Sequence, residues 1–360
     1  RFASQEVRQA TPRRLVYCLP MRVLVEQTRE KTEGWLGKLG MLANGGAGDT
    51  HPVEGWAAKQ GDKGNRIAVT VLMGGEDGSD WDLYPERDAI IIGTQDMLLS
   101  RALNRGYGMS RYRWPVHFGL LNNDCLWVMD EVQLMGVGVE TSAQLQAFCN
   151  HFGTANRVQY IWMSATVDEK RLDTVDHLMP AGGWQRLVLE SDEKNLPAVK
   201  EKYEAKKHLS KESLTLAKEN EKKSYAKELA DQIKSKHKKG TLTLVVVNRV
   251  DRAQDVYKEL LNQDRTENDT AVLHSRFREG DRKARLQLLD EKRDRIIVAT
   301  QVVEAGVDVS AHTLITELAP WPSLVQRFGR CNRRGNYDDA LIEWIDIDTQ
   351  EEKSKLALPY

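Results

Sequence analysis

The strongest constraint on the fold of this 360-residue chain is a series of short, uninterrupted apolar runs separated by longer helical patterns. Continuous apolar runs indicate strands buried on both faces, as in a parallel sheet, because strands with one wet face alternate apolar and polar residues. Parallel strands need long crossover connections, and the intervening segments are long enough to supply helices. In the first half we expect a helix over 23–39 and strands over 15–19, 67–73, 89–92, 126–129 and 158–163.

A second series of strands and helices follows residue 240. It predicts helices over 252–261 and 279–289, and strands over 241–247, 271–274, 296–299, 313–318 and 341–345. Between the two series, residues 191–240 hold 14 Lys against 9 Asp plus Glu and few large apolar residues. This composition is typical of a solvated helical linker, and a basic surface that touches a nucleic-acid backbone is the alternative. We therefore expect an α/β chain with two doubly wound lobes, 1–190 and 241–360, joined by a charged linker over 191–240.

Bulk composition excludes little. The net charge of −1 predicts neither a nucleic acid nor a membrane as a partner, although a local basic track is compatible with it. The four cysteines form no Cys-x-x-Cys pair, and single thiols fit a reducing cytoplasm. No apolar run approaches the roughly 18 residues of a membrane span. Because the chain begins with Arg1 rather than Met, we expect it to be part of a longer protein.

Two adjacent carboxylates, Asp130 and Glu131, follow the expected strand 126–129. The carboxyl ends of buried parallel strands are where such sheets bind ligands. One carboxylate can hold Mg²⁺, and the next can orient and deprotonate an attacking water. Many strands end in acids, so this pair is weak evidence alone. The strand 158–163 also ends in hydroxyl residues, Ser164 and Thr166, which can bond to such acids.

The second half carries a more specific pattern. Gly306, which follows the strand 296–299, permits a positive φ or a close backbone approach, and Asp308 is then placed to meet a nucleotide. Downstream, Arg330 and Arg333 are spaced to share one helix face. Two guanidinium groups on one face suit a γ-phosphate, because arginine presents a fixed fork of donors. A solvated basic helix end is the alternative, and the upstream pattern disfavours it.

In chain order, these patterns resemble the motifs of superfamily-two helicases. Residues 130–133, 164–166, 300–308 and 326–333 resemble motifs II, III, V and VI, and 19–28, 93–96, 245–250 and 274–277 resemble motifs Ia, Ib, IV and the motif after it. The resemblance covers nearly the whole chain. It implies two RecA-like lobes, with ATP and Mg²⁺ in the cleft between them and single-stranded DNA across both.

A finer resemblance rests on the Leu-Pro-Met-Arg-Val-Leu-Val form of 19–25, on the run 130–148 and on Asn-Arg-Arg-Gly at 332–335. These segments are similar to the helicase–nuclease of type I CRISPR systems, an antiviral defence, and especially to its G (formerly U) subtype. That family implies a three-prime to five-prime motor on single-stranded DNA. The motor is recruited by a Cascade-like surveillance complex and feeds a metal-dependent HD nuclease.

The resemblance also implies residue roles. Asp130 would hold Mg²⁺, Glu131 would be the base, and Arg330 and Arg333 would stabilise the transferred charge, while Gln133 replaces the family's more usual His and can bridge to motif VI. The expected nucleotide-binding residues are Ser164, Thr166, Gly306, Asp308 and Gln326. The residues expected to face the nucleic-acid backbone are Arg22, Thr28, Thr94, Asn248, Arg249, His274, Arg276, Thr300 and Gln301.

Two features depart from the family pattern. The sequence holds no Gly-x-x-x-x-Gly-Lys-Ser/Thr phosphate loop, and the glycine-rich stretch 45–48 is expected to be a flexible loop instead. None of the eight histidines is followed by Asp, so the nuclease site is expected outside this chain. We therefore expect a helicase core that is poorly active alone. Another superfamily-two helicase, acting on RNA or in DNA repair, and a non-hydrolysing recruitment module remain the alternatives.

Overall fold

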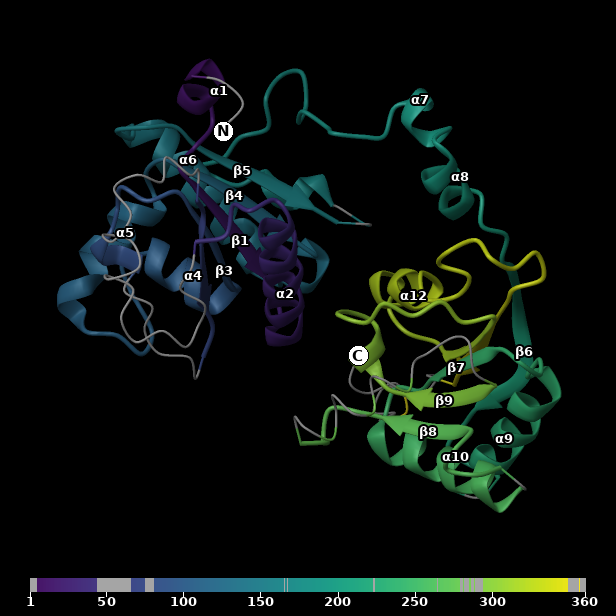
Figure 1. Ribbon diagram of the computed structural model, residues 1–360. Coiled ribbons are helices and arrows are strands. Elements are labelled where there is room, and N and C mark those ends of the chain that lie inside the picture. The colour runs from purple at the N-terminus through teal and green to yellow at the C-terminus, as the bar shows by residue number, and fades with distance from the viewer. Residues whose placement is uncertain are drawn as a thin grey trace. The chain divides into compact units, whose positions relative to one another are not determined.

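The chain folds into two compact units, 1–186 and 187–360, each built on one parallel sheet (Figure 1). The computed structural model describes residues 5–43, 66–74, 81–164, 166, 168–222, 224–263, 265–278, 281, 285, 288, 294–348 and 356. The glycine-rich stretch 45–48 and most of the helix expected over 279–289 lie outside the described residues. Among the described residues, no helix has the length and apolarity that crossing a bilayer requires.

The sheet of the first unit has five strands in the order β2-β3-β1-β4-β5. Their bounds are β1 (Arg14–Leu19), β2 (Ala68–Leu72), β3 (Ala89–Thr94), β4 (Cys125–Asp130) and β5 (Val158–Met163). All four neighbouring pairs are parallel, which confirms the prediction from continuous apolar runs.

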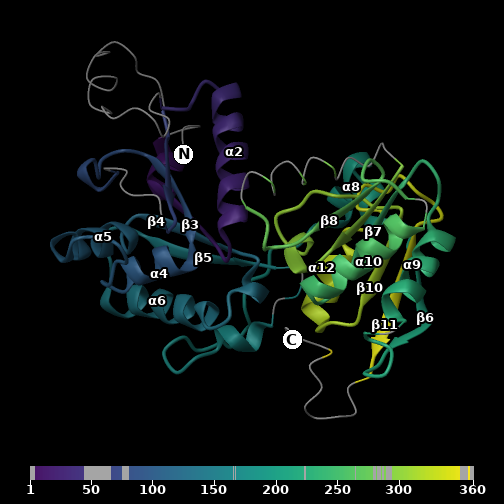
Figure 2. The same ribbon diagram turned by 90° about the horizontal axis from the view of Figure 1, so that it is seen from below.

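Helices cover both faces of this sheet, as Figure 2 shows. The longest, α2 (Arg22–Lys38), packs Val25 against the face that carries Ile92. On the other face, Val16 and Ile91 join a core with α4 (Gln95–Ala102) and α6 (Gly138–Phe152). The other helices among the described residues of this unit are α1 (Gln5–Ala10), η1 (Trp81–Leu83), η2 (Arg111–Arg113), α5 (Trp114–Leu121), η3 (Val132–Leu134) and η4 (Glu169–Leu172).

The sheet of the second unit has six strands in the order β6-β11-β10-β7-β9-β8. They are β6 (His208–Leu216), β7 (Leu242–Val246), β8 (Thr270–Leu273), β9 (Arg295–Ala299), β10 (Thr313–Glu317) and β11 (Leu341–Ile347). One face is covered by α9 (Tyr225–Lys236) and α10 (Val250–Asn262). The opposite face packs against buried side chains of 303–311 and the end of α12 (Trp321–Phe328). The stretch 303–311 begins at the last residue of η6 (Gln301–Val303).

The expected linker over 191–240 is wrong for most of its length. Its first part does form two short, exposed helices, α7 (Ser191–Lys194) and α8 (Pro197–Tyr203). The rest belongs to the second unit, because β6 pairs with β11 and α9 buries Tyr225, Leu229 and Ile233 in the core. These buried positions recur every four residues, so one apolar stripe on an otherwise Lys-rich helix was hidden by the average composition.

Candidate functional site

The two carboxylates of motif II lie at the carboxyl edge of the first sheet. Asp130 is the last residue of β4; its Oδ2 accepts a hydrogen bond from the Tyr17 hydroxyl at 2.8 Å and its Oδ1 one from the Glu131 amide at 2.9 Å. Glu131 adopts the left-handed conformation with φ 56°, which is uncommon outside glycine and turns the chain into η3. The acids therefore occupy a tight, hydrogen-bonded turn.

Tyr17 was missed from the sequence. Burial, followed by the charge of Asp130, raises the pKa of Tyr17 well above its usual value, so its hydroxyl stays a neutral donor at working pH. The pairing of β1 with β4 explains the contact, because Tyr17 lies near the carboxyl end of β1 beside Val128, two residues before Asp130. The sequence pattern did not show that these two strands are neighbours.

Gln133 links motif II to motif III. Its Nε2 donates to Glu131 Oε2 at 2.6 Å, and its Oε1 accepts from the Ser164 hydroxyl. Ser164 Oγ in turn accepts the backbone amide of Thr166 at 2.9 Å. Ser164 therefore bonds to Gln133 and not, as the sequence predicts, to the acids, and it reaches Glu131 only through the Gln133 amide. These side chains join the ends of β4 and β5.

Asp130 has the chemistry to hold a magnesium ion. Its two oxygens accept one protein hydrogen bond each, which leaves lone pairs available, and the residue is half-exposed. Proteins usually hold Mg²⁺ through one or two carboxylates, with water and substrate phosphates completing the shell. Asp130 therefore fits the metal ligand that the sequence predicts, and Glu131 beside it fits a base.

The second unit is organised around an arginine that the sequence analysis did not select. Arg327 on α12 is fully buried. Its guanidinium donates to Glu304 Oε1 at 2.8 Å, to Thr316 Oγ1 at 2.8 Å, to Glu317 O at 2.9 Å and to Asn248 Oδ1 at 2.9 Å. The segments of motifs IV, V and VI thus meet at one side chain. Its neighbour Gln326 is half-buried.

Arg330 and Arg333 do not share a helix face, so that prediction is wrong. α12 ends at Phe328, and Ala311 forms a parallel bridge with Cys331 that draws the chain out of the helix. Arg330 is buried and donates to the carbonyls of Val303 at 2.9 Å and Glu304 at 2.6 Å.

Arg333 is half-exposed and pairs with exposed Asp308, with Nε and Oδ1 3.3 Å apart. Asp308 follows Gly306, whose φ of 73° confirms the expected positive φ. Of the two arginines, Arg333 is the one with an accessible guanidinium.

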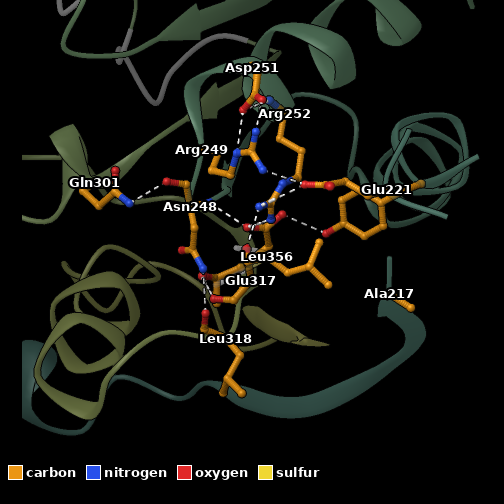
Figure 3. Close-up of polar contacts among 12 residues, drawn as sticks. Ala217, Glu221, Asn248, Arg249, Asp251, Arg252, Gln301, Glu317, Leu318 and Leu356 are labelled. Atoms are coloured by element: carbon orange, nitrogen blue, oxygen red, sulfur yellow. Dashed lines mark hydrogen bonds and ion pairs between the residues drawn. The ribbon is translucent and has the colours of Figure 1, made fainter. Parts of the chain in front are cut away.

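Figure 3 shows that Asn248 and Arg249 of motif IV bond to other residues of the second unit. Asn248 is 2% exposed; its amide group donates to Leu318 O at 2.8 Å and its carbonyl oxygen accepts from Arg327. Gln301 donates to Asn248 O at 2.7 Å, and Arg249 pairs with Glu221 at 2.9 Å and with Asp251. Asn248 is therefore a structural residue rather than the exposed strand contact that the sequence predicts.

The remaining predicted strand contacts divide by exposure. Arg22 and Arg276 are exposed and Thr28 is half-buried, so all three can reach a ligand. Thr94 and Thr300 are buried at the starts of α4 and η6.

His274 is also buried. It stacks on Phe277 with ring centroids 4.1 Å apart. Burial, followed by the charges of Arg276 and Arg285, lowers the pKa of His274, so the ring is neutral at pH 7.

Comparison with known proteins gives the second unit a family resemblance. Residues 239–336 match the protein-family model described as CRISPR-associated nuclease/helicase Cas3, C-terminal. This part of the chain is Cas3-like. The putative CRISPR-associated nuclease/helicase Cas3 of Methanocaldococcus jannaschii is 29% identical over 202 residues, which are 53% of this chain and 26% of that relative.

The CRISPR-associated helicase Cas3 of Thermoproteus tenax is 37% identical over 108 residues, which are 29% of this chain and 18% of the relative. The chain therefore spans about a quarter or less of the length of these two curated relatives.

Solved structures show the same fold across nearly the whole chain. T. fusca Cas3 with ATP has a TM-score of 0.60 at 16% identity, covering 94% of this chain and 41% of that one. The DUF1998 helicase MrfA bound to DNA and AMPPNP has a TM-score of 0.61 at 17% identity, covering 95% and 43%. The two units thus have the fold of the RecA-like lobes of Cas3 and other superfamily-two helicases, as the sequence predicts.

Proposed function

We propose that this chain is the ATP-driven, single-stranded-DNA translocating core of a Cas3-type helicase of CRISPR type I systems, of the G subtype. The observation that carries the proposal is the hydrogen-bonded path from Asp130 to the Glu131 amide, and from the Glu131 carboxylate through Gln133 to Ser164. A protein that merely bound nucleic acid would not need two carboxylates held at a sheet edge and linked to motif III. The Cas3-like match over 239–336 supports the CRISPR assignment.

Within this proposal, Asp130 would hold Mg²⁺, and Glu131 would orient and deprotonate the attacking water. Bound Mg²⁺ supplies positive charge against the ATP phosphates. Arg333 stabilises charge on the transferred phosphoryl group, with Asp308 holding its guanidinium beforehand. Arg330, which is bonded to two motif V carbonyls, shapes that segment. Ser164, Thr166, Gly306 and Gln326 line the nucleotide.

The exposed residues Arg22 and Arg276, together with Thr28, are proposed to contact the DNA backbone without reading bases. Arg249 and Gln301 hold the shape of motif IV and offer their remaining hydrogen-bonding capacity to the strand. A Cascade-like surveillance complex and an HD nuclease are the proposed partners. The M. jannaschii relative is named a CRISPR-associated nuclease/helicase and the T. tenax relative a CRISPR-associated helicase, which supports a CRISPR setting.

The function is tested by Glu131→Gln in a form of the protein that carries a phosphate loop ahead of residue 1. Loss of a positioned base is expected to lower strand-stimulated ATP turnover by about 10²–10⁴-fold. Affinity for single-stranded DNA should stay within about twofold, since the lobes and their strand contacts remain. Turnover is measured by phosphate release, and affinity by fluorescence anisotropy.

Glu86→Gln is the matched control, because that side chain is 65% exposed and distant in sequence from motif II. Retained turnover in Glu131→Gln would contradict the assignment of the base. Turnover stimulated by single-stranded RNA and not by DNA would instead favour an RNA helicase.

A further inference from the structure

Near the start of the second unit, the residues that lead from the end of α8 to β6 (201–207, the connector) contact the loop that forms the end of motif VI (329–337, the motif VI loop). Figure 1 shows α8 on this path, just before β6. Gly335 has a φ of 77°, and a Cβ built on it would lie 2.1 Å from Glu201 O and 2.8 Å from Glu201 C. Real Cβ contacts are not that short, so only glycine lets the two backbones meet.

Two side chains add to this contact. Asn332 is fully buried with φ 43°, and its Nδ2 donates to Lys206 O at 2.9 Å and to Tyr337 O at 2.6 Å. Asparagine is among the residues that tolerate this conformation best. Lys207 Nζ donates to Phe328 O at 3.1 Å, where α12 ends. The connector therefore contacts the motif VI loop at three places: just before it at Phe328, in its middle at Asn332, and near its end at Gly335.

The other side of the loop is hydrogen-bonded to Ala311, three residues after motif V. Ala311 N donates to Arg330 O at 2.8 Å, and Asn332 N donates to Ala311 O at 2.8 Å. Arg333 follows Asn332 directly, and its guanidinium reaches Asp308 of motif V. The backbone that carries Arg333 therefore lies between Ala311 on one side and the connector on the other.

We propose that the connector is a positioning element for Arg333, with Gly335, Asn332 and Lys207 as its positioning residues; this inference rests on the proposed function. A shift of the connector must move the motif VI loop, because their backbones are in contact at Gly335 and bonded at Asn332. Movement of the connector would then reach Arg333 through covalent and hydrogen-bonded links within the second unit.

The test is Gly335→Ala, with Gly240→Ala as the matched control. Gly240 lies in the same unit at φ 81°, and a Cβ at that position would meet nothing within 4 Å. Both substitutions strain a left-handed residue, and only the first pushes against the connector. In the form that carries a phosphate loop, Gly335→Ala should lower the maximal rate of strand-stimulated turnover by about 10- to 100-fold, as misplacement by roughly an ångström can. Single-strand affinity should stay within about twofold, and Gly240→Ala should leave both unchanged.

A second pair of variants avoids any folding defect. Lys207→Met removes the bond to Phe328 O from a surface side chain, whereas Lys207→Arg can keep it. The Met variant should lose turnover and the Arg variant should restore it. Hydrogen exchange on the chain itself gives a readout independent of activity, and it should be faster over 201–207 and 329–337 in Gly335→Ala than in Gly240→Ala.

The two proposals fail in different ways. If the parent protein shows no strand-stimulated turnover, the proposed function is overturned and the catalytic role of the connector with it. If the parent is active but Gly335→Ala matches Gly240→Ala in turnover and exchange, the inference alone is overturned. It is also overturned if Gly335→Ala lowers DNA affinity in step with turnover, because the loop would then belong to the strand-binding face.

Discussion

At the scale of single residues, the hydrogen bonds around Asp130 and Glu131 decide how the two acids can act. Tyr17 holds one oxygen of Asp130, and Gln133 holds one oxygen of Glu131. Groups that orient a metal ligand typically affect metal affinity about 10- to 100-fold when removed, although they touch no metal. These two neutral donors therefore orient the acids without neutralising their charge.

Tyr17→Phe tests this orientation. Removing the hydroxyl should raise the Mg²⁺ concentration needed for half-maximal ATP turnover by about tenfold. The control is Tyr112→Phe, because Tyr112 is 93% exposed. Titration of Mg²⁺ at saturating ATP and DNA measures the effect. An unchanged Mg²⁺ requirement in Tyr17→Phe would show that the hydroxyl does not position Asp130.

Arg333→Ala tests the catalytic arginine. An arginine that stabilises phosphoryl transfer is worth roughly 10³–10⁵ in rate, so turnover should collapse by about that factor while DNA affinity changes little. The neighbouring variant Arg334→Ala, whose guanidinium lies 3.8 Å from Asp308, should lose far less. If Arg333 belonged to a basic strand-binding face, the outcome would invert. DNA affinity would then fall, and turnover at saturating DNA would persist.

At the scale of elements, the paired strands β6 and β11 carry two buried carboxylates that share one lysine. Glu212 and Glu343 are 8% and 3% exposed, and they share Lys236, whose Nζ is 3.5 Å from the first and 2.6 Å from the second. Burial, followed by the neighbouring Glu212, raises the pKa of Glu343 from 4.5 to about 7. Glu212 and Lys236 lie in the segment that was expected to be a linker, and the burial of Glu212 beside Glu343 of β11 shows that β6 is an integral strand.

The raised pKa of Glu343 predicts a pH-dependent stability. A carboxyl whose pKa is higher in the folded state binds its proton more tightly there, so its contribution to stability falls as pH rises from 4.5 to about 7 and is level above that. Glu343→Gln should therefore be more stable than the parent at pH 8, by up to about 3 kcal/mol, with the difference shrinking toward pH 5.

Urea unfolding of both proteins between pH 5 and pH 8.5 measures that difference. Asp338→Asn is the control, because its side chain is 95% exposed. A difference in unfolding free energy that did not vary with pH would rule out ionisation of Glu343 as its cause.

At the scale of the whole molecule, a net charge of −1 means that the proposed attraction to DNA would have to come from local basic positions such as Arg22 and Arg276. Backbone contacts release counterions, so affinity for single-stranded DNA should fall steeply with salt. For about five phosphate contacts, the slope of log affinity against log salt is about −3.5. Affinity should also vary little with base sequence.

This prediction is measured by anisotropy titrations of unrelated oligonucleotides at several salt concentrations. Affinity that was insensitive to salt, or that changed strongly with base sequence, would contradict a motor that tracks the backbone.

Local sequence determined the strands and their direction, because buried parallel strands need continuous apolar residues and little else. It also located Asp130, Glu131 and Ser164, since these residues follow the ends of such strands. The positive φ of Gly306 was likewise readable, because few other residues adopt that conformation.

Tertiary structure alone decided which polar groups face inward. Asn248 and Arg330 look like ligand-binding residues in a linear pattern, and the fold uses their hydrogen bonds to join segments that are distant in sequence. The same applies to β6 and α9, whose Lys-rich composition concealed one apolar stripe on α9. That stripe is buried only because the second sheet, which includes β6, lies against it. A hydrogen-bond donor or an apolar stripe is visible in the sequence, but its partner is set by packing, and packing depends on residues far along the chain.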